Sequence, residues 1–237
     1  MRGTSVLVRC VRAVTGLMLL GAGALLHAAS WQRWAGVCRS SAEADVRACD
    51  LRQDHLYDFM VVAEPWEPIG TAAEQAGAAL LLVAVALLLA PWALLVRSGP
   101  YIPVALVVAS LAYAGVGAAT LRSGLAGEVV DPLLDDAAFS VWLFAPAFAL
   151  IWVAVLARGW AQAAAVFWVL ASPLVMAFSY AIGPYDANPW FEAICGDLTA
   201  CAGLCLLVAA VWPARSAKRW AGKVGERPVN ALAQGRP

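Results

Sequence analysis

Charged side chains are scarce in this chain of 237 residues, where Asp, Glu, Lys and Arg together account for only 14%. A soluble domain carries about 25% charged residues. Hydrophobic residues make up 62% of the chain, and the mean hydropathy is +0.75. A chain with so little polar surface cannot cover itself in water, so we expect the lipid bilayer to be its main solvent.

Charge is absent altogether from six long stretches, the shortest of which spans 17 residues. They are residues 13–29, 75–96, 101–121, 137–157, 159–185 and 198–214. A helix needs about 20 residues, with a range of 17–25, to cross a hydrocarbon core. Lipid offers no partners for backbone N–H and C=O groups, so each stretch must close its own hydrogen bonds as a helix. The sequence therefore predicts an all-α polytopic transmembrane bundle of six spans, forming a single membrane domain over residues 1–214.

The signs of the charges predict the orientation, because basic residues stay cytoplasmic in short loops. With both termini inside, Glu226 is the one acid of the 16 on the cytoplasmic side. Eleven of the 16 basic residues are then cytoplasmic: Arg2, Arg9, Arg12, Arg97, Arg158, Arg215, Lys218, Arg219, Lys223, Arg227 and Arg236. We expect a plasma-membrane protein whose tail, residues 215–237, is basic, disordered and held near anionic lipid.

The start of the chain has a second interpretation. An Arg-bearing segment, an apolar middle and the small residues Ala28, Ala29 and Ser30 are also typical of a secretory signal peptide. Cleavage would leave five spans and would not change the orientation of the others. Arginine outnumbers lysine by 14 to 2, and this codon-driven bias indicates a GC-rich bacterial genome.

The longest segment between spans, residues 30–73, is expected to contain a short amphipathic helix on the outer side. Ser40 and Glu43 have the spacing of a capping box, in which two side chains satisfy free N–H groups at a helix start. The apolar positions that follow at helical spacing are Val46, Cys49, Leu56 and Met60. Such a helix would lie against the membrane surface or against the spans.

The same outer segment contains two of the six cysteines, Cys38 and Cys49. Paired thiols outside the bacterial membrane usually form disulfides. A bridge closing a loop of this length would stabilise the fold by about 3 kcal/mol in the chain-entropy description. Cys195 is a third outer cysteine, so a Cys49–Cys195 bridge remains an alternative.

Four outer residues are candidates for catalysis: Asp54, His55, Asp58 and Glu74. Asp54 and Asp58 lie one helical turn apart beside an imidazole, an arrangement that can serve as a general base or bind a metal. The chain has only two histidines and no His-Glu-x-x-His motif. A solvated helix face explains the pattern as well, and no metal or cofactor is predicted.

Two outer Pro-Trp segments form a candidate surface for an envelope protein partner, through Trp66, Glu67, Trp190 and Glu192. Aromatic residues dominate protein interfaces. Tryptophan also anchors helices at the membrane boundary, which is the simpler interpretation of both segments.

The middle of each predicted span lacks Asp, Glu, Lys, Arg and His, which mark proton relays and ion paths when they occur there. The chain also lacks nucleotide-binding and hydrolase motifs, and no nucleic-acid partner is expected. These absences favour a non-enzymatic membrane protein that presents a disulfide-linked acidic outer loop to a partner or ligand. One alternative is an enzyme acting on an envelope or lipid-linked substrate at the outer face. The other is a carrier for a small neutral solute, with a path lined by Ser110, Tyr113, Ser179 and Tyr180.

Overall fold

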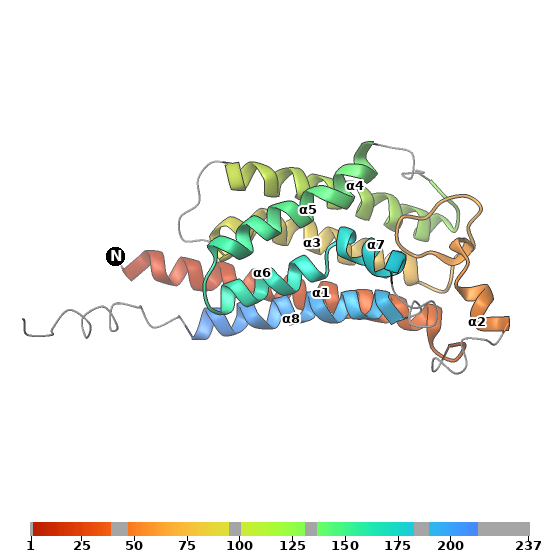
Figure 1. The fold of residues 1–237 in the computed structure, drawn as a ribbon, viewed down its shortest axis with the longest axis horizontal. Helices are drawn as coiled ribbons and strands as arrows, with labels where there is room; N and C mark the ends of the chain where they lie inside the picture. The colour runs from red at the N-terminus through yellow and green to blue at the C-terminus, as the bar shows by residue number, and fades with distance from the viewer. Residues whose placement is uncertain (1, 39–46, 95–100, 131–136, 183–189, 213–237) are drawn as a thin grey trace, which may run out of the picture.

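The computed structural model describes residues 2–38, 47–94, 101–130, 137–182 and 190–212. Every regular element within these ranges is a helix, which confirms the all-α prediction (Figure 1). The elements are α1 (Arg2–Trp34), α2 (Arg47–Arg52), the 3-10 helix η2 (His55–Tyr57), α3 (Ala72–Leu94), α4 (Tyr101–Ala126), α5 (Ala137–Leu156), α6 (Trp160–Leu170), α7 (Pro173–Ile182) and α8 (Phe191–Val211). The predicted capping box and the basic tail lie outside the described residues.

Five of these helices are long and apolar enough to cross a membrane: α1 from Val6, α3, α4, α5 and α8. The bent pair α6 and α7 makes a sixth if it is counted as one span. The chain is therefore a multi-pass membrane protein with a helical bundle, as the uncharged stretches predict.

The predicted span at residues 159–185 is not one straight helix. It breaks after Leu170 into α6 and α7, whose axes differ by 52°. Pro173 begins α7, and a proline tolerates the first position of a helix because its missing N–H would have no partner there. Proline also disfavours the helical conformation of the residue before it, so the break falls at Ala171 and Ser172.

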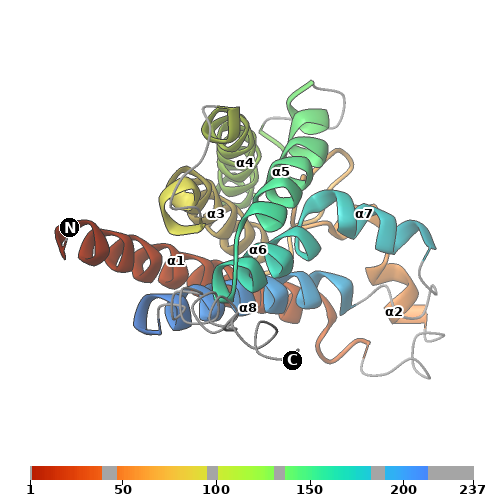
Figure 2. The same cartoon turned by 60° about the vertical axis from the view of Figure 1, so that its left-hand side comes forward.

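The helices form a closed ring. In order around the bundle, α1 packs on α3, α3 on α4, α4 on α5, α5 on α6, and α6 on α8, which returns to α1. Figure 2 shows α3 and α4 to one side and α5, α6 and α7 to the other, above the α1–α8 pair. Alanine dominates the interior of α3. Its small side chain lets neighbouring helices approach closely, which is how helices associate where lipid removes the hydrophobic driving force.

The backbones of α1 and α8 approach each other closely through glycines. Gly16 and Gly23 of α1 face Gly203 and Gly196 of α8. A Cβ added to Gly203 would lie 2.6 Å from the carbonyl oxygen of Gly16 and 2.7 Å from the amide nitrogen of Leu20. Only glycine leaves room for this approach.

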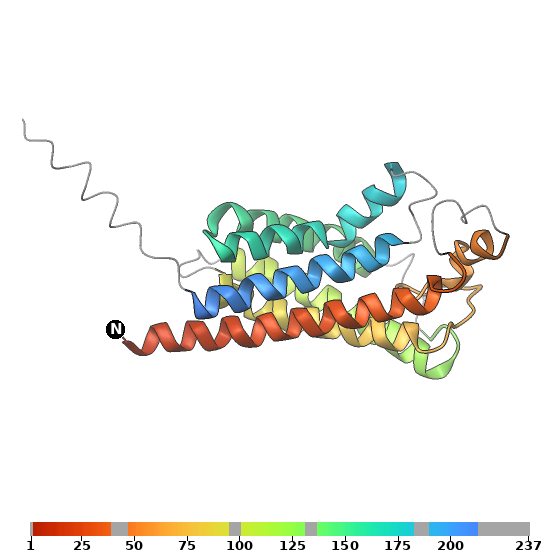
Figure 3. The ribbon, with the colours of Figure 1, turned by 90° about the horizontal axis from the view of Figure 1, so that it is seen from below.

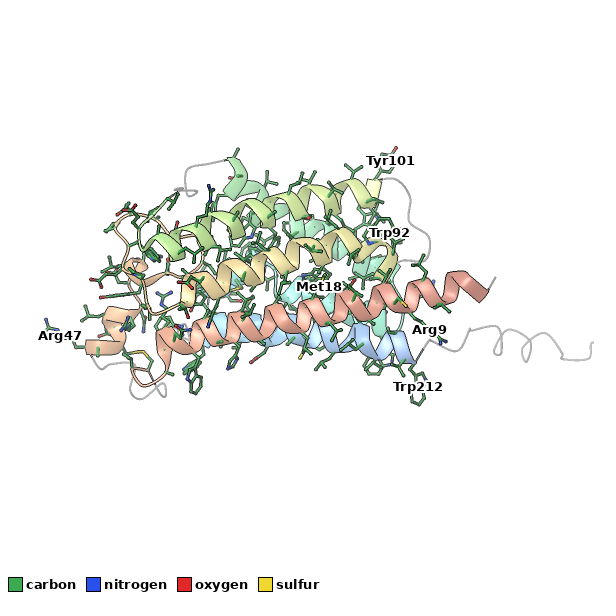
Figure 4. The ribbon with its side chains drawn as sticks, turned by 180° about the vertical axis from the view of Figure 1, so that it is seen from behind. Arg9, Met18, Arg47, Trp92, Tyr101 and Trp212 are labelled. Atoms are coloured by element: carbon green, nitrogen blue, oxygen red, sulfur yellow. A yellow bond between two sulfur atoms is a disulfide. The ribbon has the colours of Figure 1, made fainter. Side chains whose placement is uncertain are left out.

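The two ends of the bundle hold different parts of the chain. The start of α1 and the end of α8 lie at one end, and α2 lies at the other, which we call the α2 end (Figure 3). Figure 4 shows Arg9 and Trp212 together at the first end and Arg47 at the α2 end. The start of α1 and the end of α8 lie at the same end because the chain runs the length of the bundle six times, with α6 and α7 counted as one passage.

The disulfide prediction is confirmed. Cys38 and Cys49 are bonded, with a Cα–Cα distance of 5.3 Å, and they tie the end of α1 to α2. Both cysteines are buried against Trp34, which is 2% exposed. The alternative bridge through Cys195 is wrong, because that thiol is buried and donates to the carbonyl oxygen of Ala171 at 3.3 Å.

The amphipathic helix in this segment is shorter than the apolar stripe suggests. It ends at Arg52, and Leu56 lies in the separate helix η2. The cause is Asp54, which has an extended backbone (ψ 141°) and accepts a hydrogen bond from the Leu56 amide. Aspartate side chains compete with helical hydrogen bonding in this way and begin new turns.

Candidate functional site

The end of α1 carries a buried cation at the α2 end of the bundle. Arg33 is 3% exposed, although it lies one residue before the helix terminus. Its guanidinium group donates to Asp58 at 2.8 Å and to Glu192 at 2.9 Å. It also donates to the carbonyl oxygens of Arg52 and Asp54, at 3.1 and 3.2 Å. Arg33 therefore joins α1, the α2–η2 segment and α8 through one side chain.

Glu192 is the buried anion of the same cluster. It lies in the first turn of α8 and is 7% exposed. One carboxylate oxygen accepts from Arg33, and the other accepts from the indole N–H of Trp34 at 2.7 Å. Negative charge in the first turn also interacts favourably with the dipole of α8.

The cluster brings two buried charged side chains, Arg33 and Glu192, together with the partly buried Asp58. Arg33 faces two carboxylates and stacks over the Trp34 ring, with 4.4 Å from its Cζ to the ring centroid. Buried charges interact strongly because the local dielectric is low, and they persist only when they are paired and hydrogen-bonded. The guanidinium forms four hydrogen bonds, so its burial is well compensated.

Above the cluster, the segment from Gln53 to Pro65 forms a roof. Trp66 donates to the Asp58 carbonyl oxygen at 2.6 Å, and Glu67 donates its amide to the Leu56 carbonyl oxygen at 2.7 Å. These two hydrogen bonds hold the residues that follow the roof against its first half, near Leu56 and Asp58. A hydrogen bond between Tyr57 and Glu67 raises the pKa of the Tyr57 hydroxyl.

A cavity of about 830 Å³ lies beneath the roof. Its opening is polar, with Arg33, Asp58 and Glu192 beside it, and its deeper wall is apolar. The deeper wall includes Leu26, Leu80, Val83, Leu143, Trp168 and Met176. Along α8 the lining runs from Glu192 to Thr199, a rise of about 10 Å at 1.5 Å per residue. The cavity thus reaches from the α2 end well into the bundle.

Two side chains of this cavity have polar atoms that are buried without a partner among the described residues. They are the indole N–H of Trp142, a residue that is 8% exposed, and both amide atoms of Gln53. Buried polar groups are nearly always hydrogen-bonded in native proteins. These donors and this acceptor line one cavity, which indicates a site suited to a ligand with polar atoms.

The candidate catalytic residues separate into two groups. Asp54, His55 and Asp58 all line the cavity, and the His55 ring nitrogen Nδ1 lies 3.0 Å from Asp58. Glu74 does not line it, since it lies in the first turn of α3 and packs against Gly124 of α4. Among the residues that the structure describes, no group of three or more His, Cys, Asp or Glu is placed to hold a metal ion.

The four residues of the candidate partner surface do not share one environment. Trp66 and Glu67 lie at the edge of the roof, and Trp190 is half-buried beside Trp31, with ring centroids 6.0 Å apart. The expectation that Glu192 is displayed on the surface is corrected, because α8 begins at Phe191 and carries Glu192 into the bundle.

The four residues of the candidate carrier path are likewise divided. Tyr113 and Tyr180 line the cavity. Ser110 donates to the Ala84 carbonyl oxygen at 2.7 Å, and Ser179 donates to the Val175 carbonyl oxygen at 2.9 Å. Their hydroxyl groups are therefore engaged by helix backbone.

Sequence reasoning missed Arg33, the centre of the site. The signal in the sequence was the position of the charges next to predicted spans. Arg33 is the first charged residue after the uncharged stretch 13–29, and Glu192 lies six residues before the uncharged stretch 198–214. Charges just beyond the ends of spans are usually solvated, so their spacing alone did not predict burial. No protein-family model, no curated protein and no solved structure matches this chain.

Proposed function

We propose that this chain is a plasma-membrane protein, with both termini in the cytoplasm, that binds an amphipathic ligand at its outer face. The ligand enters the cavity at the α2 end, its apolar body resting on the deeper wall and its polar part remaining near Arg33, Asp58 and Glu192. The orientation rests on the sorting of basic and acidic residues. The ligand class rests on the shape and lining of the cavity.

The observation that carries this proposal is an apolar cavity beneath a charged opening. Ligand sites have volumes of about 300–1,000 Å³ and apolar walls with a few placed polar groups, and this cavity matches both features. An apolar chain buried there would gain about 0.8 kcal/mol for each CH₂ removed from water. A ligand that arrives from the bilayer gains less, so the polar groups at the opening must supply the selectivity.

Binding without covalent chemistry fits the lining better than catalysis does. The thiol of Cys195 and the hydroxyl of Thr199 both line the cavity, but each donates to a backbone carbonyl oxygen, at 3.3 and 2.8 Å. A nucleophile must be within hydrogen-bond reach of its base. His55 lies at the opening, where its partner is Asp58.

The proposal predicts a change at Trp168, which lines the cavity and is 1% exposed. The protein would be labelled with 5-fluorotryptophan and placed in phosphatidylcholine nanodiscs, with the Trp168 signal assigned through Trp168→Phe. Three twelve-carbon probes would be added in turn: dodecanol, dodecyltrimethylammonium and dodecyl phosphate. At least one probe should shift the fluorine resonance of Trp168 in a saturable way, because a ligand in the cavity alters the surroundings of that ring.

A matched pair of variants on α7 serves as the control. Ala177 lines the cavity and Ala181 does not, and both are exposed residues of the same helix. Ala177→Trp should place an indole ring in the cavity and abolish the shift, while Ala181→Trp should behave as wild type. If none of the probes shifts Trp168, or if the shift survives Ala177→Trp unchanged, the proposal is wrong.

A further inference from the structure

We infer that the polar head of this ligand is an organic cation, such as an alkylammonium group. The inference rests on the proposed function, since it names the chemistry of the ligand that the cavity takes. Two independent features of the lining support it: an excess of carboxylates at the opening and a set of aromatic residues along the cavity.

The charges at the opening do not balance. Among the residues that the structure describes, the lining contains the carboxylates of Asp54, Asp58, Glu64 and Glu192 and a single guanidinium group, that of Arg33. The His55 imidazole also lines the cavity, and its ring nitrogen lies 3.0 Å from Asp58. Arg33 is already shared between two of these carboxylates. Even with Glu192 protonated, carboxylates outnumber the guanidinium group by three to one. Arg52, two residues before Asp54, does not line the cavity and instead lies over the Tyr57 ring.

This imbalance selects for positive charge. Asp54 and Glu64 form no ion pair with any residue that the structure describes, and both are exposed at the opening. A cation there is attracted to these two carboxylates. A phosphate or carboxylate head would add a further negative charge beside Asp58 and Glu192. Charge complementarity of this kind discriminates between ligands by repelling the wrong one as well as by attracting the right one.

Two of the aromatic residues lie directly beside a carboxylate at the opening, because Trp34 and Tyr180 both hydrogen-bond to Glu192. Six rings line the cavity, from Trp34, Tyr113, Phe139, Trp142, Trp168 and Tyr180. Trp142 contacts two of the others, with ring centroids 6.1 Å from Tyr113 and 5.7 Å from Phe139. The faces of such rings attract ammonium groups, and clusters of them bind quaternary ammonium ligands. Arg33 over Trp34 already shows this contact within the protein.

The same fluorine experiment tests the inference once dissociation constants are expressed per mole fraction of probe in the bilayer, which removes differences in partitioning. Dodecyltrimethylammonium should bind at least about tenfold more tightly than dodecanol, because cation–aromatic and carboxylate contacts add to the same alkyl chain. Dodecyl phosphate should bind most weakly of the three.

Neutralising the carboxylates of Asp54 and Glu64 should remove the preference for the cationic probe over dodecanol. In Asp54→Asn/Glu64→Gln the ratio of the dodecanol to the dodecyltrimethylammonium dissociation constant should fall severalfold. Asp50→Asn neutralises an exposed acid of α2 outside the cavity and should keep the wild-type ratio. The Asn replacement retains an oxygen that can cap the Leu56 amide, so the roof should keep its fold.

The outcomes separate the inference from the proposal beneath it. Equal binding of all three probes at Trp168, or tighter binding of dodecyl phosphate, would contradict the preference for a cationic head group but would leave the proposed ligand binding intact. Absence of any shift at Trp168 would overturn both. An unchanged ratio in Asp54→Asn/Glu64→Gln would show that these carboxylates do not select the cation, and the inference would be wrong.

Discussion

Replacing Arg33 with alanine is expected to lower the free energy of unfolding by about 3–5 kcal/mol, the loss typical of breaking a buried ion pair from one side. The variant would leave Glu192, which is 7% exposed, without a cation and with only neutral donors, the Trp34 indole N–H and the Tyr180 hydroxyl, as partners among the described residues. It would also free two backbone carbonyl oxygens that Arg33 now satisfies, those of Arg52 and Asp54. The loss should therefore appear both in stability and in the order of the roof.

Unfolding in mixed detergent micelles at increasing dodecyl sulfate fraction measures this change. Arg47→Ala provides the matched control, because Arg47 is exposed at the start of α2 and should change stability by less than about 0.5 kcal/mol. Glu192→Ala and the double variant complete a cycle. The double variant should be less unstable than the sum of the two single ones, since it buries no unpaired charge. A loss for Arg33→Ala no greater than that for Arg47→Ala would contradict the cluster.

Replacing Gly203 with alanine should destabilise the bundle by about 1–3 kcal/mol, the range for overpacking a close contact. The new methyl group would lie 2.6 Å from the Gly16 carbonyl oxygen, which is backbone and cannot rotate away. The α1–α8 pair would have to separate, and that pair holds Arg33 against Glu192 at its end. The change should therefore weaken probe binding as well as stability.

Gly115 offers a control for which alanine should not lower the free energy of unfolding. It lies in the middle of α4, and a Cβ added there meets nothing within 4 Å. Gly115→Ala should leave the protein as stable as wild type or stabilise it by up to about 1 kcal/mol, the helix preference of alanine over glycine. The same unfolding assay measures both variants. Equal effects of the two substitutions would mean that α1 and α8 do not approach as described.

Much of the fold could be predicted because the bilayer imposes a simple rule on sequence. An uncharged stretch long enough to span lipid has almost no alternative to a helix, so the positions of α3, α4 and α5 agree with prediction to within a few residues. The disulfide could also be predicted, since Cys38 and Cys49 are close in sequence in an expected oxidising compartment.

The site itself could be predicted only in part. Asp54, His55 and Asp58 were recognised because they are polar neighbours in sequence, and they do line the cavity. The Arg33–Glu192 pair joins positions 159 residues apart, and it exists because α1 and α8 pack side by side. Local pattern contains no information about that pairing. The helices also continue past the uncharged stretches, which is why Glu192 was expected in a loop.

The aromatic residues along the cavity illustrate the same limit. Tryptophans near span ends are explained well enough by anchoring at the membrane boundary. Trp142 and Trp168 are instead 8% and 1% exposed and line the cavity. Burial of a tryptophan depends on which face of its helix packs against the neighbouring helices. The sequence of a helix that is apolar on all sides does not reveal that face.

Photo-crosslinking tests the central claim, that this cavity holds the apolar body of a ligand, most directly. A dodecyl probe with a diazirine at the end of its chain would be irradiated with the protein in nanodiscs, and the adducts located by tandem mass spectrometry. We expect adducts on deep cavity residues such as Leu80, Val83 and Trp168, lost in Ala177→Trp and retained in Ala181→Trp. Adducts confined to exposed side chains of the bundle exterior, such as Phe148 and Val155, would contradict the claim.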